Sequence, residues 1–413
     1  MQVTESVEIS GHLMDSGVLA RVLDDVLDYG GDYTVESISL GRTHDDESHA
    51  RLTVGADTDE ALQRILMRVQ IHGVNQVDPG QAVTRAAERD GVFPDDFYST
   101  TNLETVVRLG GQWVPVEHPE MDCGLLVEGG RVRTVPVSDV SAGDSIVCGA
   151  SGIKVVMPLV EHKAGSEAAF RFMNSSVSSE KPQALLVHQI AVRMKEVKAE
   201  SGRILWVAGP AVVHTGASAA MVALVEGGYV DVLFAGNALA THDIEAALFG
   251  TSLGVDLSQG RGVEHGHEHH IRAINTIRRA GSIAAAVEQG VLTSGVMHAV
   301  VQAGKPFVLV GSVRDDGPLP DVYTDVIEGQ RAMRAQLPGV GFAIMVATML
   351  HSIATGNILP ASVPLVSVDI NPATVTKLAD RGSAQAIGIV TDIGLFLEQL
   401  ARELVPSYSG VLA

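Results

Sequence analysis

The sequence has few cysteines and no long apolar run. Only Cys123 and Cys148 occur among 413 residues, which fits a reducing compartment and leaves no four-cysteine zinc site. Glycine, proline or charge interrupts every apolar stretch well before the roughly 18 residues that a membrane-spanning helix needs, and the first residues lack the basic and apolar start of a secretory signal. We therefore expect a cytoplasmic protein without membrane segments.

Basic residues are also scarce. The chain holds 29 Lys and Arg against 49 Asp and Glu, which gives a formal net charge of −20. Nucleic acids and anionic membranes are recognised by clusters of Lys and Arg, so neither is expected as a partner. With 46% hydrophobic residues, the chain can bury cores in two or three domains, and the expected ligand is a small molecule.

Residues 1–100 show the alternation of a ferredoxin-like α+β module. The pattern predicts strands at 3–9, 33–40, 50–54 and 74–77 and helices at 13–27 and 58–72. This β-α-β-β-α-β order is the split βαβ arrangement. Such modules bind small ligands or pair with one another, and the fold alone does not choose between these roles. We expect the chain to form a homo-oligomer.

Two further domains are predicted after residue 100. In residues 101–175, glycine turns such as Gly129-Gly130 separate short β-type runs, which favours a small antiparallel sheet or barrel. In residues 176–413, apolar runs alternate with helical stretches, which is typical of a doubly wound parallel sheet. The predicted fold class is therefore α/β, with a Rossmann-like parallel-sheet domain preceded by the ferredoxin-like module and a small β-rich domain.

Apolar runs in the second half of the chain end in polar or glycine clusters. These runs and their ends lie at 207–210, 233–237, 308–312, 345–349, 367–371 and 389–392. Parallel strands that are buried on both faces have this appearance, and the carboxyl ends of such strands together form a ligand crevice. We therefore place the ligand site at the ends of these runs.

The usual dinucleotide fingerprint is missing from this crevice. No G-x-G-x-x-G follows a strand and opens a helix, since Gly339-Val340-Gly341 precedes its strand. In its place, residues 209–218 form a glycine-bracketed turn into a helix, whose first N–H groups can face a carboxylate or a pyrophosphate. The same segment can also be a simple strand-to-helix connection.

Acidic residues end two of the apolar runs. Asp369 closes the fifth run and Asp392 closes the sixth. A carboxylate at a strand tip accepts hydrogen bonds from an adenosine ribose and repels a 2′-phosphate, so the sequence predicts NAD rather than NADP. Each of these two residues can instead be a helix cap.

Other polar groups are expected at the same edge. Residues 236–243 bring an amide, a hydroxyl, an imidazole and a carboxylate to a strand end, although Asp243 can simply cap the next helix. In the loop after the third run, one of Asp315 and Asp316 can bind an amine or a ribose hydroxyl. His351 is expected to line the crevice together with the backbone around it.

Two clusters of reactive side chains have ordinary structural explanations. The histidines within residues 265–270 match no recurrent tetrahedral metal set, so we expect a loop and no metal. Cys123 lies close to His118 and Asp122, either of which could activate it as a nucleophile. A buried and inert thiol is the commoner case.

Long motifs in this chain resemble those of the LOR/SDH domain family. They are residues 119–124 (PEMDCG), 209–216 (GPAVVHTG), 235–240 (AGNALA), 315–321 (DDGPLPD), 348–352 (TMLHS) and 369–372 (DINP). The resemblance spans nearly the whole chain. The family includes archaeal-type ornithine cyclodeaminases and the cyclodeaminase half of cyanobacterial arginine dihydrolase fusions.

The resemblance implies a tightly held NAD in a deoxyhypusine-synthase-like variant of the Rossmann fold. The implied NAD contacts are Asn237, Ala238, Asp316, Thr348, Met349, Leu350, His351, Asp369, Asp392 and Ile393. The implied reaction converts L-ornithine to L-proline and ammonia: hydride leaves an amine-bearing carbon, the second amine closes the ring, ammonia departs, and the hydride returns. Asp316 or Asp315 is the expected catalytic partner of the amine.

Several choices stay open at this point. The substrate carboxylate can be held by Lys154, by His214 or by a helix N-terminus. The sequence does not fix whether the substrate is ornithine or lysine. The alternative functions are a saccharopine- or lysine-type dehydrogenase with net reduction of NAD, and a non-enzymatic amino-acid sensor that holds NAD.

Overall fold

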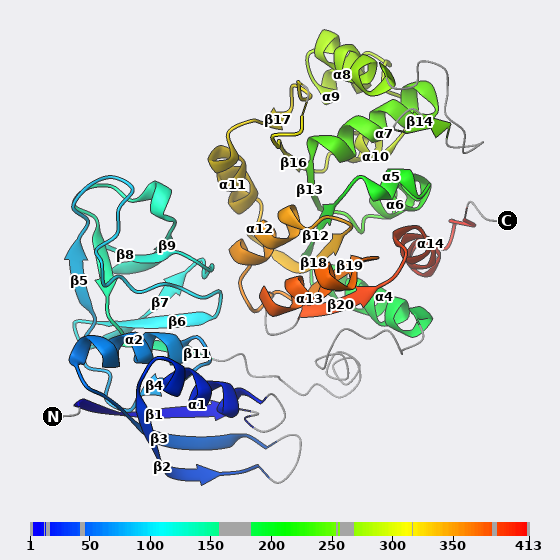
Figure 1. The fold of residues 1–413 in the computed structure, drawn as a ribbon. Coiled ribbons are helices and arrows are strands. Elements are labelled where there is room, and N and C mark those ends of the chain that lie inside the picture. The colour runs from blue at the N-terminus through cyan, green and yellow to red at the C-terminus, as the bar shows by residue number, and fades with distance from the viewer. Residues whose placement is uncertain are drawn as a thin grey trace. The chain divides into compact units, whose positions relative to one another are not determined.

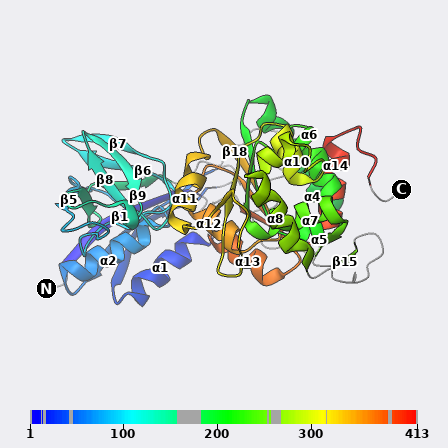
Figure 2. The ribbon, with the colours of Figure 1, turned by 90° about the horizontal axis from the view of Figure 1, so that it is seen from above.

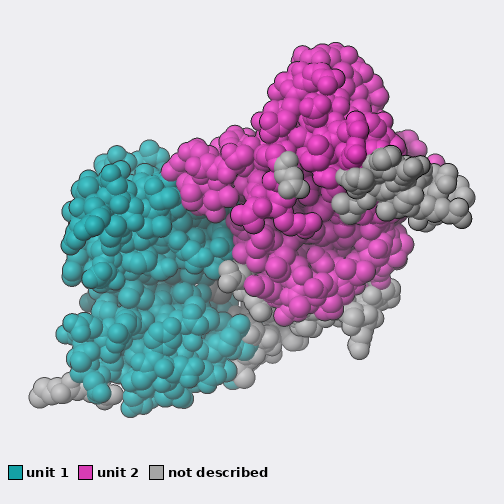
Figure 3. All heavy atoms as spheres, turned by 45° about the horizontal axis from the view of Figure 1, so that its top comes forward, with its two compact units in different colours: residues 1–162, 357–362 teal, residues 163–356, 363–413 magenta. Residues whose placement is uncertain are grey.

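The computed structural model forms two compact units. It describes residues 3–11, 13, 17–41, 46–156, 183–252, 255–256, 268–315, 317–381 and 386–410. One unit contains residues 1–162 and 357–362, and the other contains residues 163–356 and 363–413 (Figure 3). Within the described ranges, no helix is long and apolar enough to cross a bilayer.

The first unit begins with a four-stranded antiparallel sheet. Its strands are β1 (Val3–Gly11), β2 (Asp32–Ser39), β3 (Ser48–Ala56) and β4 (Asn75–Gln76), in the order β2-β3-β1-β4. Helix α1 (Val18–Asp28) buries one valine per turn against this sheet, and α2 (Asp59–Gln70) starts at Thr58, whose hydroxyl accepts from the N–H of Ala61. This arrangement confirms the predicted ferredoxin-like module.

A seven-stranded sheet completes the first unit. Its strands are β5 (Val83–Ala86), β6 (Glu104–Leu109), β7 (Gln112–Glu117), β8 (Gly124–Glu128), β9 (Arg131–Val135), β10 (Ser145–Cys148) and β11 (Ile153–Val156). The order is β11-β6-β7-β9-β8-β10-β5, and β7 and β9 pair in parallel whereas the other pairs are antiparallel. The predicted β-rich fold is therefore confirmed, but its purely antiparallel form is wrong. The domain boundaries taken from the sequence stay predictions.

The second unit contains a parallel sheet with a reversal of strand order. Its strands are β12 (Arg203–Ala208), β13 (Val232–Gly236), β16 (Phe307–Val310), β17 (Val322–Tyr323), β18 (Val340–Val346), β19 (Leu365–Asp369) and β20 (Ala386–Val390). The order is β17-β16-β13-β12-β18-β19-β20, and each pair of neighbouring strands is parallel (Figure 1). The strands that follow β12 in the sequence, β13, β16 and β17, lie on one side of it. The later strands β18, β19 and β20 lie on its other side. This confirms the predicted Rossmann-like sheet.

Helices flank the parallel sheet and connect its strands. They are α4 (Gln183–Ala199), α5 (Ala211–His214), α6 (Ser218–Glu226), α7 (Asn237–Phe249), α8 (His269–Ala280), α9 (Ile283–Glu288), α10 (Val296–Gln302), α11 (Val326–Ala335), α12 (Leu350–Ile358), α13 (Pro372–Arg381) and α14 (Ile393–Leu404). Helix α6 lies beside α10, and α4 lies beside α14 (Figure 2). A short hairpin of β14 (Thr251–Ser252) and β15 (Val255–Asp256) follows α7.

Helical periodicity in the sequence predicts one continuous stretch from residue 267 through residue 289, but the structure breaks it at Gly281. Gly281 has φ of 102°, which ends α8, and Ser282 is extended. The Ser282 hydroxyl accepts from the N–H of Ala285 and so caps α9. The apolar spacing continues across the break, which is why periodicity alone did not reveal it.

Burial explains the unbroken apolar runs. Every residue from Ile204 to Ala208 is at most 1% exposed. Helices cover both faces of such a strand, so its side chains need not alternate between apolar and polar. Charged residues therefore lie where the strands end, whereas the one buried hydroxyl inside β19, that of Ser367, donates to the carbonyl of Ile387.

Candidate active site

The strand order reverses between β12 and β18, and the two strand ends meet closely there. A Cβ atom built on Gly209, just after β12, would lie 1.9 Å from the carbonyl oxygen of Ala347, just after β18. Ala347 has φ of 51°, a left-handed conformation that L-residues rarely adopt. In open α/β sheets a crevice forms at this reversal, so the candidate site starts at these two residues.

Helix α7 begins at this edge, directly after β13. Its N-cap is Gly236, and among the described residues no side chain caps its first N–H groups. Asn237 is buried, and its Oδ1 accepts from the N–H of Leu319 at 3.0 Å. Ala238 follows it in the first turn. The segment predicted as a polar strand end is thus the start of a helix whose backbone donors can meet an anion.

Asp243 does not lie among the crevice residues. Its carboxylate is 1% exposed and accepts from the N–H groups of Val296 and Met297, each at 2.8 Å. It therefore caps α10, a distant helix, and not the next helix as the sequence suggested. Burial raises the pKa of Asp243 to about 6, whereas the two N–H donors act in the opposite direction.

The motif 348–352 opens α12. The imidazole of His351 lies against Gly236, because a Cβ atom built there would be 3.2 Å from Cε1 of His351. Burial lowers the pKa of His351, and a contact with the Val310 backbone and the charge of Asp315 act in the opposite direction. The Thr348 carbonyl accepts from the Ser352 hydroxyl. Met349 and Leu350 are exposed at 40% and 73%.

The loop after β16 is closed by one of its own carboxylates. Oδ2 of Asp315 accepts from the N–H of Ser312 at 2.8 Å. At the end of the loop, Asp321 accepts from the N–H of Ile283 at 2.9 Å. Asp316, the other expected catalytic residue, lies outside the described residues.

The two acidic strand tips differ in what they bind. Oδ1 of Asp369 accepts from the N–H of Asn371 at 2.8 Å, and Asn371 in turn accepts from the N–H of Ala373 in α13. Oδ1 of Asp392 accepts from the N–H of Leu395 at 2.9 Å and caps α14. Ile393 is buried at the first position of α14.

The remaining candidates have structural surroundings. Cys123 is 2% exposed, and its N–H donates to the Thr100 hydroxyl. The Asp122 carboxylate accepts from the amide of Asn357 at 3.1 Å. Lys154 is exposed on β11 in the first unit. The buried thiol favours the structural interpretation of the motif 119–124.

Only part of the histidine cluster can be described. His269 and His270 open α8, whereas His265 and His267 lie outside the described residues. In the part of the chain that the structure describes, no group of three or more His, Cys, Asp or Glu side chains could hold a metal ion.

Sequence reasoning missed a network of polar side chains beside the crevice. It joins His214 on α5 to Ser252, and His242 and Glu245 on α7 to Thr251 and His269. Glu245 is fully buried. The sequence signal is the spacing of three between His242 and Glu245, which places both on one side of a helix. That spacing becomes informative only once α7 is recognised as a helix.

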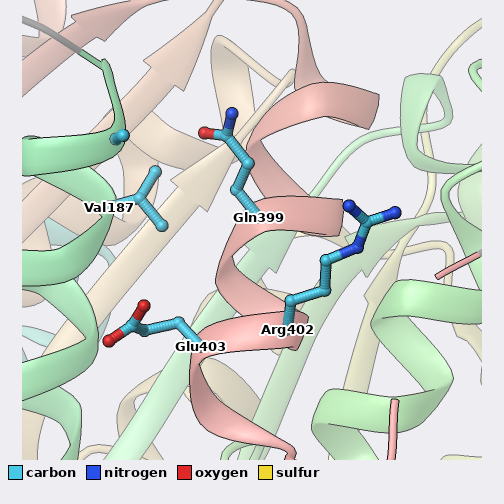
Figure 4. Close-up of a pocket in the computed structure, with 5 residues that line it drawn as sticks. Val187, Gln399, Arg402 and Glu403 are labelled. Atoms are coloured by element: carbon cyan, nitrogen blue, oxygen red, sulfur yellow. The ribbon is translucent and has the colours of Figure 1, made fainter. Parts of the chain in front are cut away.

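A small cavity lies away from the crevice, between α4 and α14. It has a volume of about 260 Å³ and is lined by Ala184, Val187, Gln399, Arg402 and Glu403 (Figure 4). Residues 399–403 belong to the second half of α14, whereas the crevice is at the start of that helix. The strand ends, and not this cavity, therefore define the candidate site.

A doubly wound parallel sheet with polar residues at its carboxyl edge defines a Rossmann-like protein. Residues 188–400 match the family described as arginine dihydrolase ArgZ-like, C-terminal, Rossmann fold. Residues 4–103 match the LOR/SDH bifunctional enzyme conserved region, and residues 104–187 match the first region of the ArgZ-like C-terminal part. The chain belongs to this LOR/SDH and ArgZ-like family.

Individual relatives agree with this assignment. An ornithine cyclodeaminase of Methanothermobacter thermautotrophicus is 52% identical over 97% of this chain and 98% of that protein. The apo crystal structure of the cyanobacterial arginine dihydrolase ArgZ superposes with a TM-score of 0.85 at 36% identity, over 98% of this chain and 58% of that one. A ternary complex of AgrE with ornithine and NAD⁺ has a TM-score of 0.53 at 40% identity, over 98% and 57%.

Proposed function

We propose that this protein is an NAD-dependent ornithine cyclodeaminase, which converts L-ornithine to L-proline and ammonia. The observation that carries the proposal is the nearly full-length similarity to the archaeal ornithine cyclodeaminase, together with a parallel sheet whose strand order reverses, the place where such sheets bind their ligands. A relative of 40% identity binds ornithine and NAD⁺ together, which supports the same pair of ligands here.

The crevice residues fit NAD. The start of α7 offers backbone N–H groups of Asn237 and Ala238 that no described side chain caps, as a pyrophosphate requires. Asp369 offers a carboxylate at a strand tip, which suits a ribose with free hydroxyls and repels a 2′-phosphate. The residues that would hold NAD are Asn237, Ala238, Asp316, Thr348, Met349, Leu350, His351, Asp369, Asp392 and Ile393.

The protein's own residues would then bind and orient the amino acid. NAD supplies a hydride acceptor that can return the hydride to the cyclised product. The substrate carries two ammonium groups, and the loop of Asp315 and Asp316 is the proposed carboxylate partner of one of them. Its Pro318 and Pro320 restrict the loop, which favours an ordered site and the exclusion of water that would hydrolyse an imine.

A product assay tests this function. The purified protein with NAD should release ammonia and proline from ornithine, while the absorbance of reduced nicotinamide stays unchanged. A steady rise of that absorbance would indicate an amino-acid dehydrogenase instead. Binding of ornithine without either change would indicate a sensor. The same assay with lysine and arginine determines the chain length that the site accepts.

We also propose a cytoplasmic homo-oligomer. The buried state of both cysteines is compatible with a reducing compartment. Strand β2 is at the edge of its sheet and exposes Val35 and Ile38 at 41% and 46%, and Leu40, directly after the strand, is 53% exposed. An edge strand with exposed apolar side chains is a common pairing surface. Light scattering should give a mass above that of one chain, and a monomeric mass would contradict the assembly.

A further inference from the structure

The network beside the crevice has a continuous set of polar contacts. Nδ1 of His242 lies 2.9 Å from Oε2 of Glu245, and Oε1 of Glu245 lies 2.9 Å from the hydroxyl of Thr251. That hydroxyl lies 2.8 Å from Nδ1 of His269. The ring of His242 in turn lies beside the ring of His214, with centroids 5.0 Å apart.

The burial of Glu245 determines which groups donate protons in the hydrogen bonds of this network. Its side chain has 0% exposure and the side chain of His242 has 12%. A buried carboxylate is stable only when donors or a positive charge compensate it. The Thr251 hydroxyl has one proton and gives it to Glu245, so it accepts from Nδ1–H of His269, while His242 gives its Nδ1–H to Glu245. Glu245 thus fixes the orientation of His242.

His214 is the exposed member of the network and lies at the crevice edge. It ends α5, which follows β12, and His242 is on α7, which follows the neighbouring strand β13. The residue after it, Thr215, lies against Gly394 at the start of α14, because a Cβ atom built on Gly394 would be 3.3 Å from Thr215. Helices α5 and α7 therefore both begin at the carboxyl edge of the sheet, which holds the proposed NAD contacts.

One nitrogen of His214 is held and the other can serve the substrate. Nδ1 lies 2.6 Å from the hydroxyl of Ser252, which orients the ring. This leaves Nε2 as the nitrogen that can exchange a proton. A nitrogen base that is oriented by a hydroxyl, with a second imidazole and a buried carboxylate behind it, is an arrangement suited to general acid–base chemistry.

We propose that His214 is a catalytic proton acceptor and donor for the substrate's nitrogen atoms, and that His242 and Glu245 position it. This inference rests on the proposed cyclodeaminase function. The substrate has two ammonium groups, and a carboxylate of the Asp315 and Asp316 loop pairs with only one of them. His214 is the proposed base for the second ammonium group.

The proton balance of the reaction suits a single imidazole. Nε2 accepts a proton from a substrate ammonium group, so one N–H bond of the substrate breaks and one N–H bond of the imidazole forms. The neutral amine can then react. The imidazolium later returns this proton to the nitrogen that leaves as ammonia, and His214 is neutral again. No proton is gained or lost over the cycle, and no further reactant is needed.

The electrostatic surroundings keep His214 able to accept a proton. Burial lowers the pKa of His214 most, the charge of His242 lowers it further, and Glu245 acts in the opposite direction. The other titratable groups around it are His269, which is linked through Thr251, and Asp392, which lies with Thr215 against Gly394. At neutral pH the imidazole is therefore neutral.

Substitution of His214 tests the catalytic role. His214→Asn retains a polar atom near the position of Nδ1 and removes Nε2, so the turnover rate should fall by about 10²-fold or more while NAD affinity stays the same. In His214→Ala, added imidazole should restore part of the turnover. The matched control is His188→Asn, which breaks an exposed pair with Glu403 at 2.8 Å on α4 and α14 and should leave turnover unchanged.

Substitution of His242 tests the positioning role. His242→Asn can still donate to Glu245 but removes the electrostatic effect of the His242 ring that lowers the pKa of His214, so the pKa of His214 should rise. The acidic limb of the kcat/KM profile should move to higher pH. A role limited to folding would lower the amount of folded protein and leave that limb in place.

The outcomes separate this inference from the function it assumes. If the wild-type protein releases no ammonia from ornithine, the proposed function fails, and the catalytic role of His214 fails with it. If the wild-type protein is active and both His214 variants turn over ornithine at the wild-type rate, only the catalytic role of His214 is wrong. If the His214 variants are inactive but imidazole restores nothing and the His242 profile does not move, His214 acts structurally and the proposal is overturned.

Discussion

Helices α7 and α14 begin at the same edge of the same sheet, and yet their first turns are built differently. Helix α14 has Asp392 as its N-cap residue, and the carboxylate of Asp392 accepts a hydrogen bond from the N–H of Leu395. Helix α7 has Gly236 as its N-cap residue, which has no side chain. Among the described residues, no side chain accepts from the first N–H groups of α7. Both helices follow a parallel strand of this sheet, although β13 lies inside the sheet and is buried whereas β20 is a half-buried edge strand.

The difference fits the proposed role of the start of α7 in holding NAD. The first N–H groups of a helix need acceptors, and a capping carboxylate supplies one at a gain of about 0.5–2 kcal/mol. A helix that lacks a capping side chain gives up this gain and keeps its donors for an anion. The start of α14 is therefore capped by the protein itself, whereas the start of α7 keeps its donors available for the proposed NAD.

The largest effect is expected when α7 is made to resemble α14. Gly236→Asp would place a carboxylate at the N-cap, where it accepts the first N–H groups and repels a pyrophosphate. Gly236 has φ of −89° and ψ of 169°, which an L-residue can adopt. NAD binding should weaken by about 3 kcal/mol, the upper end of the range for hydrogen bonds to charged groups, as measured by isothermal titration.

Gly236→Ala is the steric control for this variant. Its Cβ atom would lie 3.2 Å from Cε1 of His351, so it adds a close contact without a charge. It should bind NAD more tightly than Gly236→Asp does. Equal losses in the two variants would show that space, and not the helix donors, limits binding.

The next effect concerns Asp369, a strand-tip carboxylate that is not the cap of the following helix. Asp369→Ala should weaken NAD binding by about 1–3 kcal/mol, because a polar partner of the ribose is removed. The preference over NADP should shrink as well, since the charge that repels a 2′-phosphate is lost. Titrations of both cofactors on both proteins measure this. Equal affinity of the wild-type protein for NAD and NADP would contradict the role of Asp369.

A smaller effect is expected when α14 is made to resemble α7. Asp392→Ala removes the cap, so the free energy of unfolding should fall by about 1 kcal/mol in denaturant titrations. Asp392→Asn retains an oxygen acceptor and should recover most of this loss. If Asp392→Ala weakened NAD binding more than Asp369→Ala does, Asp392 would be the stronger of these two proposed NAD contacts, in addition to capping α14.

No effect is expected from the removal of metal ions. The histidines near the start of α8 are interpreted as a loop and a helix start, so dialysis against EDTA should leave ammonia release and thermal unfolding unchanged. Activity that disappears on dialysis and returns with zinc would contradict this interpretation.

The sequence predicted those parts of the site that depend on the strand ends. Asp369 and Asp392 each follow an apolar run, and charged residues are placed most easily at the ends of strands that pack in a sheet core. The ferredoxin-like module was equally predictable, since Thr58 and the regular apolar spacing of α2 mark a helix without any tertiary information.

Long-range contacts could not be predicted in this way. Asp243 caps a helix that starts more than fifty residues later, so its local surroundings suggested a different helix. The role of Glu245 depends on Thr251 and His269, which approach it only after the chain turns back behind α7. Periodicity describes one element at a time, and a polar network belongs to several.

Helix α12 begins in residues of the second unit and ends in residues of the first unit, which limits how this enzyme can be divided. The helix begins beside Gly236 in the second unit, and the residues that end and follow it belong to the first unit, where the Asn357 carbonyl accepts from Met121 and the N–H of Ala361 donates to Asn102. A fragment that began at residue 183 would expose these groups and the buried Leu359. The Rossmann-like half therefore cannot be transferred alone. Recombination can move it between proteins only together with the β-rich domain that precedes it.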